Sequence, residues 1–259
     1  MSNQLVQDAL GLLSGSFVGF SLGLVGGGGS ILAVPLMVYL VGVPTAHVAI
    51  GTSAFAVAVN AAANLLSHAR TGTVKWSCAG VFALAGVAGA FAGSSLSKMV
   101  DGQKLLALFA VLMLVVAGVM FARRASVGNA DVRLDGGNFL KLVLSGLATG
   151  TLSGFFGIGG GFLIVPSLMF ATGMPIINAI GSSLVGVTAF GATAALNYAL
   201  SGLVDWRLAA TFIAGGVMGG LAGGGLAGVL GGRRGVLNAI FAAVVGVVAI
   251  YMLVRSMLG

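Results

Sequence analysis

The chain has 259 residues, of which 58% are hydrophobic and only 7% are charged, and its net charge is +7. Soluble domains carry roughly 25% charged residues, so this composition excludes a soluble globular protein and predicts a polytopic membrane protein. The 12 Lys and Arg residues are spread over short loops instead of forming one basic run, which argues against nucleic-acid binding. The lone Cys78 excludes an internal disulfide.

The first half of the sequence contains apolar pieces separated by short polar turns, and several are long enough to cross a bilayer. We expect these pieces at residues 9–25, 31–43, 46–66, 76–96 and 105–121. Residues 1–9 contain Asp8 and no Lys or Arg, so the positive region of a cleaved signal peptide is missing. We therefore expect the first piece to be retained in the membrane.

The most polar stretch, residues 123–141, is followed by a second series of apolar pieces. We expect these at residues 142–156, 162–172, 176–200, 208–230 and 236–253. The chain then divides into a first transmembrane repeat (1–122), a basic linker (123–141) and a second transmembrane repeat (142–259). The positive-inside rule places the linker on the cytoplasmic side and leaves the side of the termini undecided.

Two glycine clusters mark corresponding places in the two halves. Residues 26–30 precede an apolar run that ends at Pro35, and residues 157–161 precede one that ends at Pro166, 131 residues further along. Further matches follow at an offset of 130: Gly51-Thr52-Ser53 with Gly181-Ser182-Ser183, and Trp76 with Trp206. The chain is therefore predicted to be a duplicated unit, a common construction among secondary transporters.

The predicted fold is all-α, with about eight transmembrane helices in two homologous repeats and a glycine-rich break in the first helix of each repeat. If each broken helix crosses the membrane once, the repeats are parallel. If its two pieces form a hairpin, the repeats are inverted. The Lys and Arg residues divide 8 to 4 between the two sides under both schemes, so the sequence leaves both open.

The glycine clusters have a chemical interpretation and a structural one. A helix that starts after a glycine break presents free backbone N–H groups, and its N-terminal partial positive charge suits an anion. Such backbone survives in a bilayer only where protein or a watery cavity satisfies it. Two facing breaks would form an anion site near the membrane midplane. The alternative is tight helix packing, which is the role we assign to the regularly spaced Gly215, Gly219 and Gly223.

One pair of hydroxyl residues follows the Gly-x-Pro turn of each half. These pairs are Thr52-Ser53, after Pro44, and Ser182-Ser183, after Pro175. Inside the membrane they can donate to a substrate oxygen or bond back to their own helix. The predicted substrate-binding residues are Gly26, Gly27, Gly28, Gly29, Ser30, Thr52, Ser53, Gly157, Gly159, Gly160, Gly161, Ser182 and Ser183. We predict no catalytic residue, metal site or cofactor, because the sequence has no P-loop lysine, Ser-His-Asp set or HExxH motif.

With these motifs the sequence resembles the TauE/SafE family of sulfite and sulfur-anion exporters, also grouped as 4-toluene sulfonate uptake permeases. The resemblance covers essentially the whole chain. It rests on the glycine-rich-x-x-x-Val-Pro segments, the Gly-x-Pro turns at 42–44 and 173–175, and the Gly-(Thr/Ser)-Ser steps. It implies a bacterial inner-membrane transporter of about eight helices, linked to sulfite, thiosulfate or organosulfonates. One departure is Ser30, which stands where the second cluster has Gly161.

Together these features predict a secondary transporter of a small anion, and the resemblance implies sulfite, thiosulfate or an organosulfonate. The anion would be held between the two glycine breaks, and transport would follow from one half rocking against the other. A passive anion channel and a non-transporting membrane scaffold are the alternatives. The expected partners are the anion and the lipid bilayer, and the oligomeric state stays open.

Overall fold

The computed structural model describes residues 2–122, 134–229 and 234–258, and within these ranges its secondary structure is entirely helical. The long helices have 21 to 25 residues and are α1 (Ser2–Val25), α3 (Ala46–Arg70), α4 (Trp76–Ser97), α5 (Gly102–Ala122), α6 (Gly136–Phe156), α8 (Ile176–Leu200), α9 (Trp206–Val229) and α10 (Arg234–Leu258). The short segments are the 3-10 helix η1 (Gly26–Leu32), α2 (Ala33–Pro35), the π-helix η2 (Leu36–Leu40) and α7 (Gly161–Thr172).

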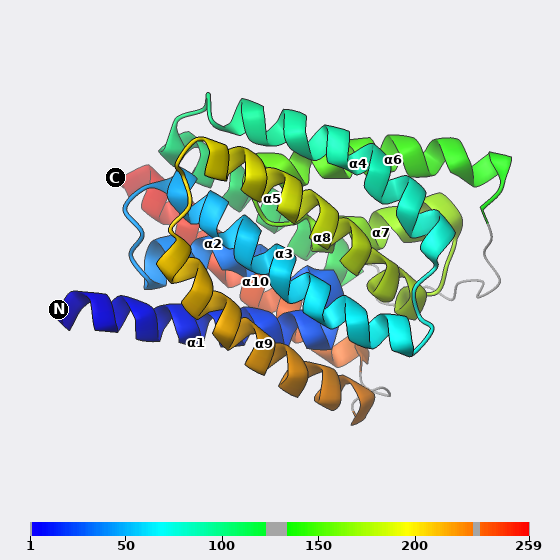
Figure 1. Ribbon diagram of the computed structural model, residues 1–259, viewed down its shortest axis with the longest axis horizontal. Coiled ribbons are helices and arrows are strands. Elements are labelled where there is room, and N and C mark those ends of the chain that lie inside the picture. The colour runs from blue at the N-terminus through cyan, green and yellow to red at the C-terminus, as the bar shows by residue number, and fades with distance from the viewer. Residues whose placement is uncertain (1, 123–133, 230–233, 259) are drawn as a thin grey trace.

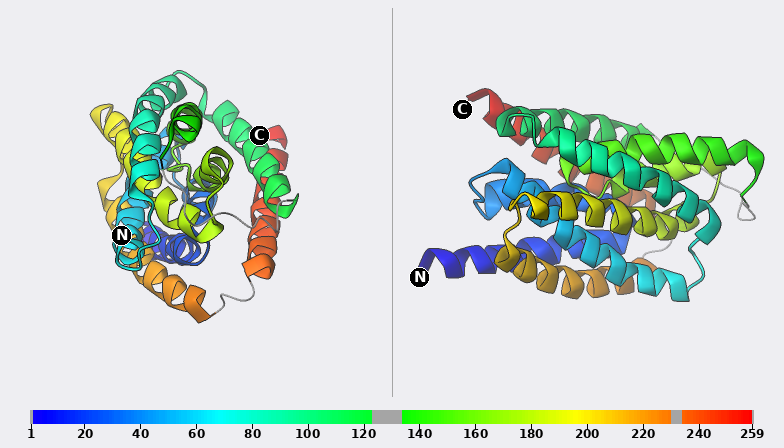
Figure 2. Two further views of the ribbon diagram at one scale, coloured as in Figure 1. Left: turned by 90° about the vertical axis from the view of Figure 1, so that its right-hand side faces the viewer. Right: turned by 45° about the horizontal axis from the view of Figure 1, so that its top comes forward.

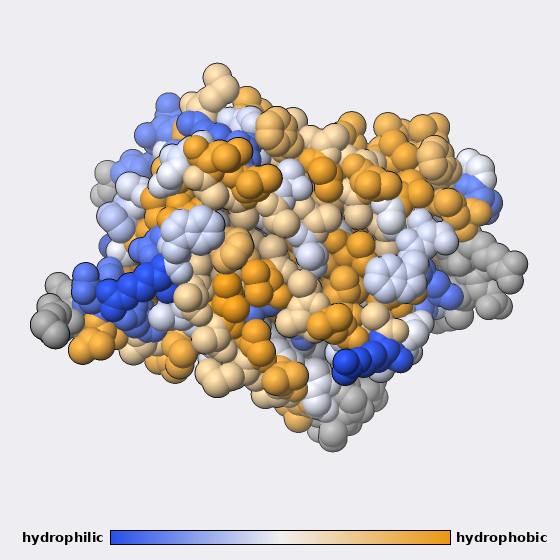
Figure 3. All heavy atoms as spheres, viewed as in Figure 1, coloured by the Kyte–Doolittle hydropathy of each residue, from blue (hydrophilic) through white to orange (hydrophobic). Residues whose placement is uncertain are grey.

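The prediction of a polytopic α-helical membrane protein is confirmed. Among the described residues, six helices are long and apolar enough to cross a bilayer, namely α1, α3, α4, α6, α8 and α9. Large apolar side chains such as Leu84, Phe170 and Leu221 are exposed on the outside. Figure 3 shows hydrophobic residues over the middle of one face and hydrophilic residues gathered toward its ends, as a lipid-facing surface requires.

Helix α6 begins at Gly136, six residues before the expected start of that apolar piece. The cause is a capping box: the Asp135 carboxylate accepts a hydrogen bond from the Asn138 backbone N–H, and the Asn138 side chain accepts one from the Asp135 N–H. These residues belong to the linker predicted over 123–141, of which residues 123–133 lie outside the described part of the chain.

The glycine faces of two helix pairs produce the closest packing in the molecule. Gly15, Gly19 and Gly23 of α1 meet Phe212, Gly216 and Gly220 of α9 in the same order, so these helices run parallel. Gly146, Gly150 and Gly154 of α6 likewise meet Phe82, Gly86 and Ala90 of α4. At each crossing the backbones touch, because glycine has no Cβ to separate them. Gly215, Gly219 and Gly223 also face α1, as their spacing predicts.

Helices α3 and α8 form the centre of the bundle and run antiparallel. Gly51, near the start of α3, lies against Tyr198, near the end of α8, and Gly191 lies against Ala58. Since α3 and α8 match each other at the offset of 130, corresponding helices of the two halves point in opposite directions. Figure 2 shows, in its view along the helices, that α7 lies inside a ring of longer helices.

Each glycine cluster lies at the tip of a hairpin. In Figure 1, α1 runs from the N-terminus toward the right, and residues 26–40 return toward the left before α3 begins. Helix α6 runs parallel to α4 and so leads away from Lys75, whereas α7 leads back to Asn178, whose side chain donates to the Thr73 carbonyl. The hairpin alternative, and not a single broken crossing, therefore describes both halves.

Candidate functional site

The second glycine cluster is a sharp turn between α6 and α7. Gly157, Gly159 and Gly160 have φ values of 64°, 63° and 66°, in the left-handed region that glycine adopts without a steric penalty. The Gly157 and Ile158 N–H groups donate to the Ser153 carbonyl and close the end of α6. Gly160 is the N-cap of α7.

The turn lies deep inside the protein. A Cβ added to Gly159 would touch Val57 of α3 and Val187 of α8, and both valines lie near the middle of their 25-residue helices. Ile158 is fully buried between the glycines. The turn is therefore about equally far from the two ends of the central helix pair, as expected for a site at the membrane midplane.

The start of α7 presents the backbone N–H groups of its first turn. The Leu163 and Ile164 N–H groups both donate to the Gly160 carbonyl. The N–H groups of Gly161 and Phe162 lie before these two donors, at the end of the helix where intrahelical acceptors are lacking. These donors point out of the N-terminal end of a 12-residue helix, where the partial positive charge of the helix dipole is concentrated.

The first glycine cluster has a different backbone. Gly26, Gly27, Gly28 and Gly29 belong to the 3-10 helix η1, whereas Gly157, Gly159 and Gly160 form a turn with positive φ. The chain continues through α2 and η2, so the 3-10, α and π forms follow one another within 15 residues. Segment η1 packs against α7 and α8, which brings the two predicted glycine segments together. Ser30, at the end of the first cluster, is fully buried.

The predicted hydroxyl pairs are buried and bonded to the protein. The Thr52 hydroxyl accepts a hydrogen bond of 2.9 Å from the Asp205 N–H, at the start of α9. The Ser182 hydroxyl accepts one of 2.9 Å from the Lys75 N–H, at the start of α4. These bonds repeat at the offset of 130, and each ties the central helix of one half to a loop of the other half.

The second residue of each pair bonds differently. The Ser53 hydroxyl donates to the Ile50 carbonyl at 3.0 Å and lies 3.4 Å from the Gly157 carbonyl oxygen, so it links α3 to the second glycine turn. The Ser183 hydroxyl donates to the Ile180 carbonyl of its own helix at 2.8 Å. Of the four hydroxyls, that of Ser53 is hydrogen-bonded to the second glycine turn.

Ser153 is a polar residue at the turn that the sequence reasoning missed. Its side chain is 1% exposed, and its Oγ has no hydrogen-bond partner among the described residues. A Cβ added to Gly160 would lie 2.8 Å from this oxygen, so the hydroxyl covers the open face of the α7 N-cap. The internal repeat could not reveal it, because Leu22 occupies the matching position in the first half.

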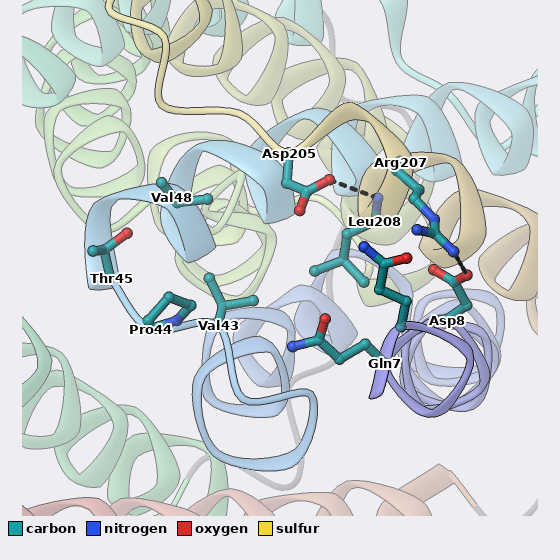
Figure 4. A pocket seen from close by; sticks show the side chains of 10 residues that line it. Gln7, Asp8, Val43, Pro44, Thr45, Val48, Asp205, Arg207 and Leu208 are labelled. Carbon is teal, nitrogen blue, oxygen red and sulfur yellow. Dashed lines mark hydrogen bonds and ion pairs between the residues drawn. The ribbon is translucent and has the colours of Figure 1, made fainter. Parts of the chain in front are cut away.

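Charged side chains lie at the helix ends. Arg207, at the start of α9, forms an ion pair with Asp8 of α1 beside a cavity of about 440 Å³ that Thr45 and Asp205 also line (Figure 4). In the described part of the chain, the buried polar side chains are serines, threonines, asparagines and Tyr198, and none of them is charged. No group of three or more His, Cys, Asp or Glu residues that could hold a metal ion occurs there.

The chain matches the family described as sulfite exporter TauE/SafE over residues 11–252. It is 52% identical to a probable membrane transporter protein of Xylella fastidiosa over 94% of both chains. It is also 30% identical to a probable membrane transporter protein of Haemophilus influenzae over 74% of this chain and 73% of that protein. A third relative, a probable membrane transporter protein of Bacillus subtilis, is 26% identical over 76% of this chain and 81% of its own length.

No solved structure matches the chain. The family match covers nearly all of the described helices, including the two glycine hairpins, and the Xylella fastidiosa relative covers 94% of the chain. The chain therefore belongs to the TauE/SafE family of membrane transporters.

Proposed function

We propose that this protein is a secondary transporter of a small anion, namely sulfite, thiosulfate or an organosulfonate, bound between the two glycine-rich hairpin tips. The observation that carries the proposal is the start of α7. A regular helix begins at a left-handed glycine turn near the centre of the bundle, so the positive end of its dipole and its first-turn N–H groups lie at that depth.

The proposed fold consists of two inverted repeats, each built from a hairpin followed by three long helices. The opposite directions of α3 and α8 and the paired bonds of Thr52 and Ser182 support this arrangement. The basic residues favour a cytoplasmic location for the end that carries the linker. That end holds Arg70, Lys75 and Lys141, whereas Lys98, Lys104, Arg207 and Arg255 lie toward the other. We place the protein in a bacterial inner membrane with both termini outside the cytoplasm.

The packing suggests which parts would move. Helix α1 packs most extensively on α9, and α6 on α4, so each hairpin is held by a helix of the opposite half. If each half moved as one rigid body, the contact of α1 with α9 and that of α6 with α4 would both break. We therefore propose that each hairpin moves with its partner helix around the central pair α3 and α8, which exposes the anion to one side at a time.

The proposed function is tested with purified protein in liposomes loaded with labelled sulfite, thiosulfate or a sulfonate. Saturable flux and counterflow are expected, whereas a passive channel shows no counterflow and a scaffold shows no flux. Gly160→Leu should abolish transport, because the new side chain would fill the face now covered by Ser153. Gly118→Leu is the control, since a Cβ at Gly118 meets nothing within 4 Å. Normal transport by folded Gly160→Leu protein would refute the site.

A further inference from the structure

The Ser153 hydroxyl stands out among those of α6 because it is unpaired. Ser145, Thr149 and Thr151 on the same helix each donate to a carbonyl of the preceding turn. Such back-bonding is the usual fate of hydroxyls in membrane helices. The Ser153 Oγ is buried and has no partner among the described residues. An unpaired buried polar group is unfavourable, so this hydroxyl is suited to a ligand that supplies the missing acceptor.

The Ser153 hydroxyl lies beside the N-terminal end of α7. Gly160 is the N-cap of α7, and a Cβ at this position would lie 2.6 Å from the Ser153 Cβ and 2.8 Å from its Oγ. The first-turn N–H groups of Gly161 and Phe162 emerge from the same helix end. Two independent kinds of donor, a helix N-terminus and a buried side chain, therefore converge beside Gly160.

The site can attract an anion only through partial charges, because no charged side chain among the described residues lies buried there. Buried polar side chains are uncharged throughout the described part of the chain, and Lys98 and Arg207 are engaged at helix ends by Asn197 and Asp8. A helix N-terminus is equivalent to roughly half an elementary charge. The cost of removing an ion from water grows with the square of its charge, whereas its attraction to a fixed dipole grows only linearly. A dianion would therefore meet about four times the cost and gain only about twice the attraction.

We propose that the site at Gly160 takes its oxyanion in the singly charged form, as hydrogen sulfite or a monoanionic sulfonate, with the Ser153 hydroxyl donating to one anion oxygen. This inference rests on the proposed function and adds the charge class of the substrate and the residue that recognises it. Because the second tip leads into the regular helix α7 and the first into η1 and the three-residue α2, we assign the anion to the second hairpin and the opposing wall to the first.

The charge class is tested with two probes of fixed charge and similar shape. Methanesulfonate is a monoanion and sulfate a dianion at all pH values near neutral. We expect methanesulfonate to shift the unfolding temperature of the purified protein and to compete with labelled sulfite uptake, with sulfate at least about tenfold weaker. Labelled sulfite uptake at a fixed total concentration should fall as pH rises and hydrogen sulfite loses its proton.

The role of Ser153 is tested with Ser153→Ala, which should weaken methanesulfonate binding about tenfold, because a hydrogen bond to a charged group is lost. Ser14→Ala is the matched control, since Ser14 Oγ is also buried and without a partner among the described residues but lies on α1. Ser14→Ala should leave the affinity unchanged.

The outcomes separate the two proposals. If neither probe binds and no sulfur anion is transported, the proposed function fails and this inference fails with it. If sulfate binds as tightly as methanesulfonate, the charge class is wrong while the transport function stands. If Ser153→Ala protein binds methanesulfonate as well as Ser14→Ala protein does, Ser153 has no part in recognition.

Discussion

The two glycine hairpins have nearly the same sequence pattern and different structures. At the second tip, left-handed glycines lead into α7, a regular helix of 12 residues. At the first tip, η1 leads into three residues of α-helix and five of π-helix. A dipole accumulates along aligned peptide units, so of the two tips the second has the stronger positive helix end. Duplication has produced one regular helix end, where we propose the anion site, and one irregular partner.

The two glycine-packed helix pairs, α1 with α9 and α6 with α4, in contrast resemble each other closely. Variants at these contacts should have the largest effects on stability. Gly19→Leu on α1 and Gly150→Leu on α6 each force a side chain into the backbone of the partner helix, at Gly216 and Gly86 respectively. Each should cost more than about 3 kcal/mol, seen as loss of monodisperse protein in detergent. A large difference between the two variants would contradict the equivalence of the pairs.

Gly157→Ala tests the strained turn of the second hairpin. The substitution places a Cβ at φ 64° and against Ile50, so both backbone strain and overpacking contribute, about 2–3 kcal/mol in total. Gly173→Ala is the matched control, because its φ is 71° but a Cβ there meets nothing within 4 Å. The control should cost only about 1 kcal/mol in thermal unfolding, and equal losses would show that packing at the turn contributes nothing.

Thr52→Val and Ser182→Ala test the paired hydrogen bonds between the halves. Each variant leaves a backbone N–H without its acceptor, at Asp205 or at Lys75, and should lower stability by about 1–2 kcal/mol. Thr52→Ser keeps the hydroxyl and should behave like the parent protein in the same unfolding measurement. Unequal losses would mean that the central pair is not symmetric.

Asn60→Leu should have the smallest effect on stability of these variants, and it should not destabilise the protein. Asn60 is fully buried on α3, and neither its amide oxygen nor its nitrogen has a partner among the described residues. Phe190 occupies the matching position on α8, so an apolar side chain suits this environment. Replacing the unpaired amide by a side chain of similar shape should leave stability unchanged or raise it by up to about 1 kcal/mol. A clear loss of thermal stability would show that Asn60 has a partner in the folded protein.

The sequence was sufficient to predict the helical membrane fold and the two glycine segments, since apolar length and glycine spacing are local signals. It could not distinguish a hairpin from a single crossing, because both schemes give the same distribution of basic residues. Ser153 was not predicted, because a comparison of the two halves highlights the residues that they share, and the counterpart of Ser153 is Leu22. The acceptor role of Thr52 depends on Asp205, 153 residues away, which no local pattern predicts.

The packing of each hairpin on a helix of the other half also has a consequence for biosynthesis. Helix α1 is made first, but the glycine face that it presents is covered by α9, which is among the last helices synthesised. The Thr52 hydroxyl likewise has no Asp205 to bind until the chain is nearly complete. Insertion of the first half must therefore yield a loosely associated set of helices, and final assembly waits for the end of translation. A chain truncated at the linker should be a target for membrane quality control instead of a stable half-protein.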